Sequence, residues 1–191
     1  MQQLLDNYNS HKDKETATEI LNQLEKGIIF NDKVKVDLSN IPDSILDDCK
    51  YLSEKGFVIG GSIMLKIFGM INRDINDFDL FLSDELNYHD VIKKYEYRLP
   101  PRKLSFIEEL FPLSNCSKDD DYEDNESKFE CKIENLKNSD KKIDIFSDKL
   151  GYFVTNGIKI QSNPFGALRA KLKYYRDKDI NDFVFIFNKI I

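Results

Sequence analysis

Hydrophobic and polar residues alternate in several short segments of the chain, which predicts a set of β-strands. Residues 77–82 (DFDLFL) alternate strictly, a pattern typical of a strand with one buried face. Residues 152–161 predict a hairpin, because Asn156-Gly157 separates two alternating runs and favours a tight turn. The other segments with strand character are 34–38, 57–59, 128–135 and 141–148.

Other segments carry helical patterns, so the fold class expected is α+β. Asp43 follows Pro42 and is a good N-cap residue, and Gly56 suits the end of the helix that Asp43 begins. Helices are predicted over 13–26, 43–55, 63–68, 88–96 and, as one or two pieces, from Pro164 to the end.

The C-terminal segment places two acids among its apolar residues. At 100° per residue, one helical stripe contains Leu168, Leu172, Tyr175, Phe183 and Ile186. Asp179 and Asp182 fall on the same stripe, and burial there would require them to pair with a neighbouring cation. Alternatively, these acids hold Lys171, Arg176 and Lys178 close to a bound phosphate. Lys171 lies at the edge of the stripe and is the best candidate, whereas a solvated face suits the other two cations.

These elements divide the chain into three parts. Residues 1–42 form an N-terminal appendage, 43–162 form the core, and 163–191 form a C-terminal helical segment. Within the core, residues 99–127 contain three of the five prolines and the acidic run at 119–126 (DDDYEDNE). We expect this stretch to be a flexible insertion that is disordered at its acidic tip.

The acidic run explains the net charge of the chain. The sequence has 34 acidic and 28 basic residues, a net charge of −6, and the run holds six acids and no base. Without it the acidic and basic residues are equal in number, so the remaining chain has no basic excess typical of nucleic-acid binders. The run is expected to be a solvated loop, although it would also suit a basic protein partner.

The composition and the cysteine and histidine pattern exclude further classes of protein. A hydrophobic content of 41% with 14 Phe and 9 Tyr is enough for a packed core. The chain has no apolar run of membrane-spanning length and its first residues lack the layout of a secretion signal, so we expect a cytoplasmic protein. Three cysteines and two histidines without metal-ligand spacing predict reduced thiols and no zinc site.

Three aspartates lie on predicted strands with the same facing. Asp77 and Asp79 are two residues apart, so they share one face, whereas Phe78 and its aliphatic neighbours face the core. In the strand at 141–148, Asp144 lies opposite the aliphatic face in the same way. If the two strands are neighbours, the three carboxylates gather at one place, which suits Mg²⁺ or Mn²⁺ and two-metal phosphoryl transfer.

Gly60-Gly61-Ser62 is a candidate phosphate-binding turn. It follows the apolar strand 57–59 and precedes a predicted helix. Glycines at such a position allow a phosphate to approach the backbone, and the Ser62 hydroxyl can donate a hydrogen bond. The turn is followed by the strand that carries Asp77 and Asp79. The two features together favour a phosphate and metal site more strongly than either feature alone.

At these residues the sequence resembles the nucleotidyltransferase superfamily related to DNA polymerase beta. That family has a hydrophobic-Gly-Gly-Ser turn, an Asp-hydrophobic-Asp strand and a later hydrophobic-Asp-hydrophobic strand, matched here by 58–62, 77–81 and 143–146. The segment 167–183 (ALRAKLKYYRDKDINDF) is similar to the corresponding segment of bacterial toxin-like members, including abortive-infection types. The resemblance covers roughly residues 45–97 and 128–185 and implies a mixed β-sheet flanked by helices.

The resemblance also implies roles for individual residues. Asp77, Asp79 and Asp144 would be the catalytic residues and would hold two Mg²⁺ (or Mn²⁺) ions. The nucleotide would be bound by residues of the turn and by two cations: Gly60, Gly61, Ser62, Arg73 and Lys171. The reaction expected is transfer of a nucleoside monophosphate from an NTP to a hydroxyl acceptor, with release of pyrophosphate.

The sequence leaves the acceptor open, since relatives modify RNA ends, proteins or small molecules. Two other classes of protein also remain. One is a catalytically silent nucleotide-binding or regulatory module, possible in a toxin–antitoxin or defence system. The other is an interaction protein whose acidic run engages a basic partner.

Overall fold

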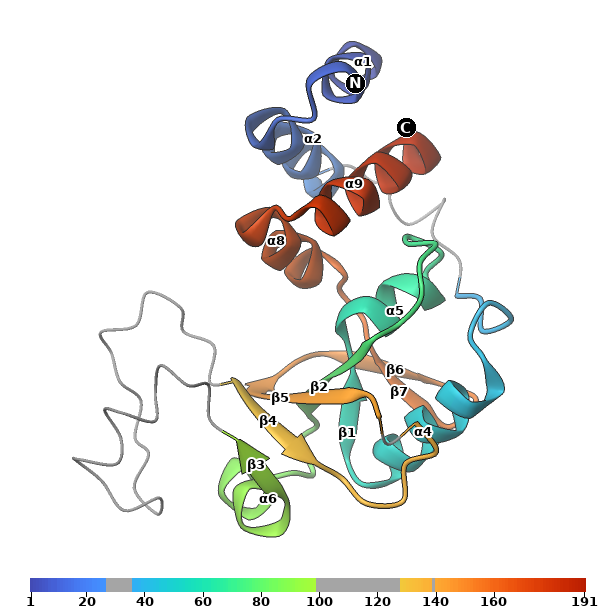
Figure 1. The fold of residues 1–191 in the computed structure, drawn as a ribbon, viewed down its shortest axis with the longest axis vertical. Coiled ribbons are helices and arrows are strands. Elements are labelled where there is room, and N and C mark those ends of the chain that lie inside the picture. Colours follow the sequence, from blue (N-terminus) through green and yellow to red (C-terminus); the bar gives the residue numbers. More distant parts are fainter. Residues whose placement is uncertain (27–35, 99–127, 139) are drawn as a thin grey trace, which may run out of the picture.

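The structure is a computed structural model, and it describes residues 1–26, 36–98, 128–138 and 140–191. It has an α+β architecture in which helices flank a mixed β-sheet (Figure 1). The helices are α1 (Gln2–His11), α2 (Lys14–Lys26), α4 (Asp43–Glu54), α5 (Gly61–Ile67), α6 (Tyr88–Lys94), α8 (Phe165–Tyr174) and α9 (Asp177–Ile190). The strands are β1 (Phe57–Ile59), β2 (Asp77–Leu82), β3 (Glu96–Arg98), β4 (Lys128–Lys132), β5 (Lys142–Lys149), β6 (Tyr152–Thr155) and β7 (Ile158–Gln161). The α+β class, the mixed sheet and the C-terminal helices were all expected from the sequence.

The sheet has the strand order β3-β4-β5-β2-β1-β7-β6. β2 is antiparallel to β1 and parallel to β5, and β1 is also parallel to β7. The strict alternation of β2 appears directly in its burial, because Phe78, Leu80 and Leu82 are buried and the intervening residues are half-buried. β2 and β5, the two strands predicted to carry the aspartates, are therefore neighbours near the middle of the sheet.

The helices at the two ends of the chain pack together beside the sheet (Figure 1). α1 contacts α9, and the ring of the fully buried Tyr8 lies edge-on to Phe187 with 5.1 Å between the ring centroids. α2 contacts α8, and α8 contacts α5. The segment predicted as an N-terminal appendage therefore shares a continuous hydrophobic core with the C-terminal helices.

Several element boundaries differ from those predicted. Pro42 is the N-cap of α4 and Asp43 is its first helical residue, because the extended backbone of Pro42 (ψ 141°) ends there. Residues 36–38 are irregular instead of forming a strand, and residues 34 and 35 lie outside the described part. β4 ends at Lys132 rather than at 135, since the chain turns at Asn135 with φ 69°.

Two elements were not predicted at all, namely α1 and β3. The C-terminal segment is two helices, divided at Tyr175, whose φ of 48° is left-handed. The predicted acidic insertion at 99–127 lies outside the described residues. Within the described residues Cys49 and Cys131 are free thiols, as expected, and Cys116 falls in that same insertion. Across the described ranges, no helix combines the length and apolar character needed to cross a membrane.

Candidate functional site

The sheet brings the three predicted aspartates together on β2 and β5. Asp79 pairs with Asp144 in the parallel register of these strands, and Asp77 pairs with Lys142. Residues that pair across neighbouring strands share a face, so Asp144 lies on the same side of the sheet as Asp77 and Asp79. The stacked rings of Phe81 and Phe146, 4.9 Å apart between centroids, lie beside the aspartates on this side. We call this side of β2 and β5 the acidic face.

The aspartates differ in their surroundings. Asp77 and Asp79 are half-buried, whereas Asp144 is only 2% exposed. An oxygen of Asp144 lies 3.6 Å from the ammonium nitrogen of Lys142, whose own side chain is about half exposed. A cation at this distance offsets part of the cost of burying a carboxylate. Asp144 therefore lies on the acidic face next to the ammonium group of the partly exposed Lys142.

The Gly60-Gly61-Ser62 turn lies directly against Asp79. Gly61 has φ +54°, and a Cβ built on it would lie 1.7 Å from a carboxylate oxygen of Asp79. The backbone N–H of Gly60 donates a hydrogen bond to the carbonyl oxygen of Asp79 (2.9 Å). Only glycine at position 61 leaves room for the aspartate, so this residue is required by its contact with the acidic face as well as by its backbone conformation.

Gly61→Ala is expected to destabilise the protein by about 2–4 kcal/mol, since left-handed backbone and displacement of a packed neighbour both cost energy. Chemical denaturation measures this loss. Gly157→Ala is the matched control, because its φ is +78° and no described atom lies within 4 Å of the place that its new Cβ would occupy. A loss no larger than that of Gly157→Ala would show that Asp79 does not press against the turn.

Arg73 connects the turn to the C-terminal helix α9. Its guanidinium donates to the Ser62 hydroxyl oxygen (3.0 Å) and to both carboxylate oxygens of Asp182 (3.2 Å each). Ser62 and Asp182 are buried, and Arg73 is about one-quarter exposed. The predicted nucleotide-binding residues Ser62 and Arg73 are therefore in contact with each other, and Arg73 also has a structural partner.

Lys171 lies in the same ion cluster and is buried. Its ammonium nitrogen is 2.7 Å from Asp182 and 3.5 Å from Asp179, and both carboxylates are at most 5% exposed. Burial by itself raises the pKa of Asp179, but hydrogen bonds from Arg176 and the charge of Lys171 outweigh it, so the net pKa is lowered. The two acids on the apolar stripe are thus paired with cations, as their burial requires. We call Arg73, Lys171, Arg176, Asp179 and Asp182 the ion cluster.

Arg176 is the most exposed cation of the ion cluster. Its guanidinium donates to Asp179 (2.8 Å) and lies 5.1 Å from the centre of the Tyr174 ring. The pKa of Arg176 is raised, mainly by the hydrogen bond to Asp179, and the charge of Asp77 adds to the shift. The sequence favoured a solvated role for Arg176, and its side chain is more than half exposed.

Gln161 is a residue of the site that the sequence did not reveal. It ends β7, next to β1, and is only 5% exposed. Its side-chain oxygen lies 2.8 Å from the place that a Cβ on Gly60 would occupy, beside the ring of Phe81. That oxygen has no hydrogen-bond partner among the described residues. A polar residue at the end of a hairpin is ordinary in sequence, so only the packing against Gly60 distinguishes it.

Gln161→Met is expected to stabilise the protein by about 1 kcal/mol, because it removes a buried unsatisfied oxygen and keeps the side-chain shape. For a chain of this size the melting temperature would rise by roughly 2–4 °C. Gln23→Met, at an exposed position of α2, should leave it unchanged. A lower melting temperature for Gln161→Met would mean that the amide makes favourable hydrogen bonds in solution.

The carboxylates of the acidic face are the type of ligand that a hard divalent cation prefers. Three carboxylates on adjacent strands supply the oxygen ligands that Mg²⁺ and Mn²⁺ prefer. Among the described residues, no three His, Cys, Asp or Glu side chains converge as a formed metal site. Metal binding would therefore require the side chains of Asp77, Asp79 and Asp144 to rotate toward one another.

Comparisons with protein-family models, with curated proteins and with solved structures found no match to this chain. The functional conclusion therefore rests on the residues and their geometry.

Proposed function

We propose that the chain is a divalent-metal-dependent nucleotidyltransferase that moves a nucleoside monophosphate from an NTP to a hydroxyl acceptor. One observation carries the proposal: Asp79 packs over the Gly60-Gly61 turn and is in register with Asp144 on the neighbouring parallel strand. This places the glycine turn beside carboxylates that suit Mg²⁺.

In the proposed complex the triphosphate lies along the turn. Gly60 and Gly61 add no side chain of their own beside Asp79 and Phe81, and Ser62 is kept in place by its hydrogen bond from Arg73. Arg176 is more than half exposed and is free to bind a phosphate with the donors that Asp179 does not use. Lys171 would act indirectly, by stabilising the carboxylates that position Arg73 and Arg176.

Asp77, Asp79 and Asp144 would hold two metal ions, which would supply charge neutralisation at the triphosphate and activation of the acceptor hydroxyl. In the transfer step the acceptor oxygen forms a bond to the α-phosphorus, and the bond from that phosphorus to the bridging oxygen of the β-phosphate breaks. The electron pair of the broken bond leaves with pyrophosphate. The acceptor proton passes to a carboxylate oxygen of Asp144, which lies beside Lys142.

The test is to incubate the purified protein with each of four α-³²P-labelled NTPs, Mg²⁺, total RNA, lysate protein and small-molecule extract. We expect label to appear covalently in one of these fractions, together with stoichiometric pyrophosphate. Omitting Mg²⁺, or adding EDTA, should abolish labelling. The labelled fraction then identifies the class of acceptor.

Calorimetry with the same NTPs distinguishes the enzyme from a silent nucleotide-binding module. Mg²⁺-dependent NTP binding without any labelled acceptor or pyrophosphate would favour the silent module. A lack of NTP binding at millimolar concentration, with or without Mg²⁺, would contradict the proposed function altogether.

A further inference from the structure

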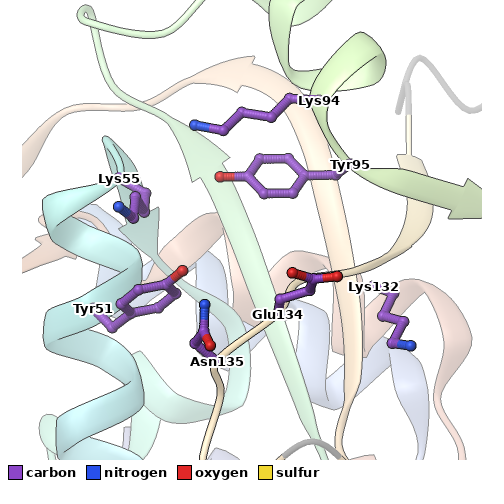
Figure 2. Close-up of a pocket in the computed structure, with 7 residues that line it drawn as sticks. All are labelled: Tyr51, Lys55, Lys94, Tyr95, Lys132, Glu134 and Asn135. Carbon is purple, nitrogen blue, oxygen red and sulfur yellow. The ribbon is translucent and has the colours of Figure 1, made fainter.

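A cavity of about 310 Å³ lies between α4 and α6 (Figure 2). It is lined by Tyr51 and Lys55 from α4 and its C-terminal end, by Lys94 and Tyr95 from the end of α6, and by Lys132, Glu134 and Asn135 at and after the end of β4. This volume lies at the lower end of the range for small-ligand sites in proteins. The cavity is therefore large enough for a ligand the size of a nucleoside monophosphate.

The cavity lies on the side of the sheet opposite the acidic face. The ring of Tyr95 packs against Phe57, with 5.8 Å between centroids. Phe57 pairs with Leu82 in the β1–β2 register, and Leu82 alternates with Phe81, which lies on the acidic face. The sheet thus separates the cavity from the candidate transfer site, and a ligand bound here would not touch Asp79 or Asp144.

Three lysines and one glutamate line the cavity, so it is positively charged in a chain whose net charge is −6. Lys55 and Lys94 lie at the carboxyl ends of α4 and α6, where a cation also complements the helix dipole. Lys132 ends a β-strand and has no such role. Its ammonium group points away from the two tyrosines (Figure 2), because Lys132 shares the strand face of Glu130, which pairs with Asp144. Lys55 and Lys94, from two different helices, are therefore the lining cations that face the same space.

The cavity also offers neutral hydrogen-bonding groups. In Figure 2 the hydroxyl ends of Tyr51 and Tyr95 point into the space between the two helices, and the Asn135 amide lies below them. The ammonium groups of Lys55 and Lys94 lie 5.2 and 5.5 Å from the centres of these two rings. Burial, and to a lesser degree the proximity of Tyr51, raises the pKa of Tyr95, so this hydroxyl is a donor at neutral pH.

We propose that this cavity is a second ligand site, which binds the sugar-phosphate unit of a nucleotide, either free or within a single-stranded RNA. Lys55, Lys94 and the tyrosine hydroxyls would donate to phosphate oxygens, for which ammonium groups are effective partners. Glu134 would accept hydrogen bonds from sugar hydroxyls, which inorganic phosphate does not offer. The aromatic rings add surface on which a base can stack. This site does not depend on the proposed transfer reaction.

The experiment is an NMR titration of the metal-free, full-length protein in EDTA. AMP, CMP, GMP and UMP are one set of probes, and the single-stranded hexanucleotide U6 is the other. We expect shifts of the amide resonances of Tyr51, Tyr95 and Asn135. In a variant with Lys55→Gln and Lys94→Gln, the affinity should fall about tenfold or more, because charge-assisted hydrogen bonds are lost. Binding of the mononucleotides identifies a free nucleotide as the ligand, and binding of U6 alone identifies RNA.

Two controls make the result specific. A variant with Lys12→Gln and Lys26→Gln loses the same charge at exposed positions away from the cavity, and it should bind like the wild type. Asp79→Asn should also bind like the wild type, which separates this site from the acidic face. Equal loss in both lysine variants would reveal non-specific electrostatics and overturn the proposal. It would also be overturned if neither the mononucleotides nor U6 shifted these resonances, or if inorganic phosphate bound as tightly as they do.

Discussion

Replacing Lys171 with methionine is expected to lower the free energy of unfolding by about 3–5 kcal/mol, the usual cost of removing one partner from a buried ion pair. Lys171 is 2.7 Å from Asp182 and 3.5 Å from Asp179, and none of these side chains is more than 9% exposed. Methionine fills the volume but leaves two carboxylates with less positive charge in a poorly solvated place. Urea denaturation followed by circular dichroism measures the change.

Lys178→Met is the matched control, because Lys178 is exposed on α9 and should contribute within about 0.5 kcal/mol. The result also separates the two roles of Lys171 that the sequence left open. A purely nucleotide-binding lysine would lower NTP affinity and leave stability intact. A structural lysine lowers stability, and loses NTP affinity only through the displacement of Arg73 and Arg176. Unchanged stability of Lys171→Met would contradict the structural role.

The strands and the grouping of the aspartates were predictable because they depend on local alternation. The period of two in DFDLFL determines which side chains share a face, and the same period in 143–146 gives Asp144 the matching orientation. That β2 and β5 are neighbours is a property of the sheet topology. The sequence predicted that the three carboxylates would gather if these two strands were neighbours, and in the structure the strands are neighbours.

The partners of the cations could not be predicted, because they are set by long-range packing. Arg73 meets Asp182, which is 109 residues away, and the helical stripe placed Lys171 only at the edge of the buried face. The stripe also assumed one continuous helix, whereas the left-handed Tyr175 divides it into α8 and α9 and turns Arg176 outward. Gln161 was missed because its significance lies in contact with Gly60, 101 positions earlier in the chain.

Asp77→Ala and Asp79→Ala are each expected to reduce Mg²⁺-dependent NTP turnover by at least about 10³-fold, since metal ligation supplies several kcal/mol of transition-state stabilisation. Asp144→Asn should lower turnover by about 10²–10⁴-fold if Asp144 also accepts the acceptor proton. Turnover is measured as release of pyrophosphate from the NTP that the labelling experiment identifies. All three variants should keep the circular dichroism spectrum of the wild type.

Two exposed aspartates test whether these losses arise from the acidic face or from the loss of charge. Asp84→Ala removes a carboxylate just after β2, and Asp148→Asn neutralises one near the end of β5. Both should retain full turnover, because neither lies beside the Gly60-Gly61 turn. Activity retained in both Asp77→Ala and Asp79→Ala would exclude the acidic face as the metal site. Loss of turnover in Asp79→Ala with unchanged turnover in Asp144→Asn would keep the metal site and exclude Asp144 as the base.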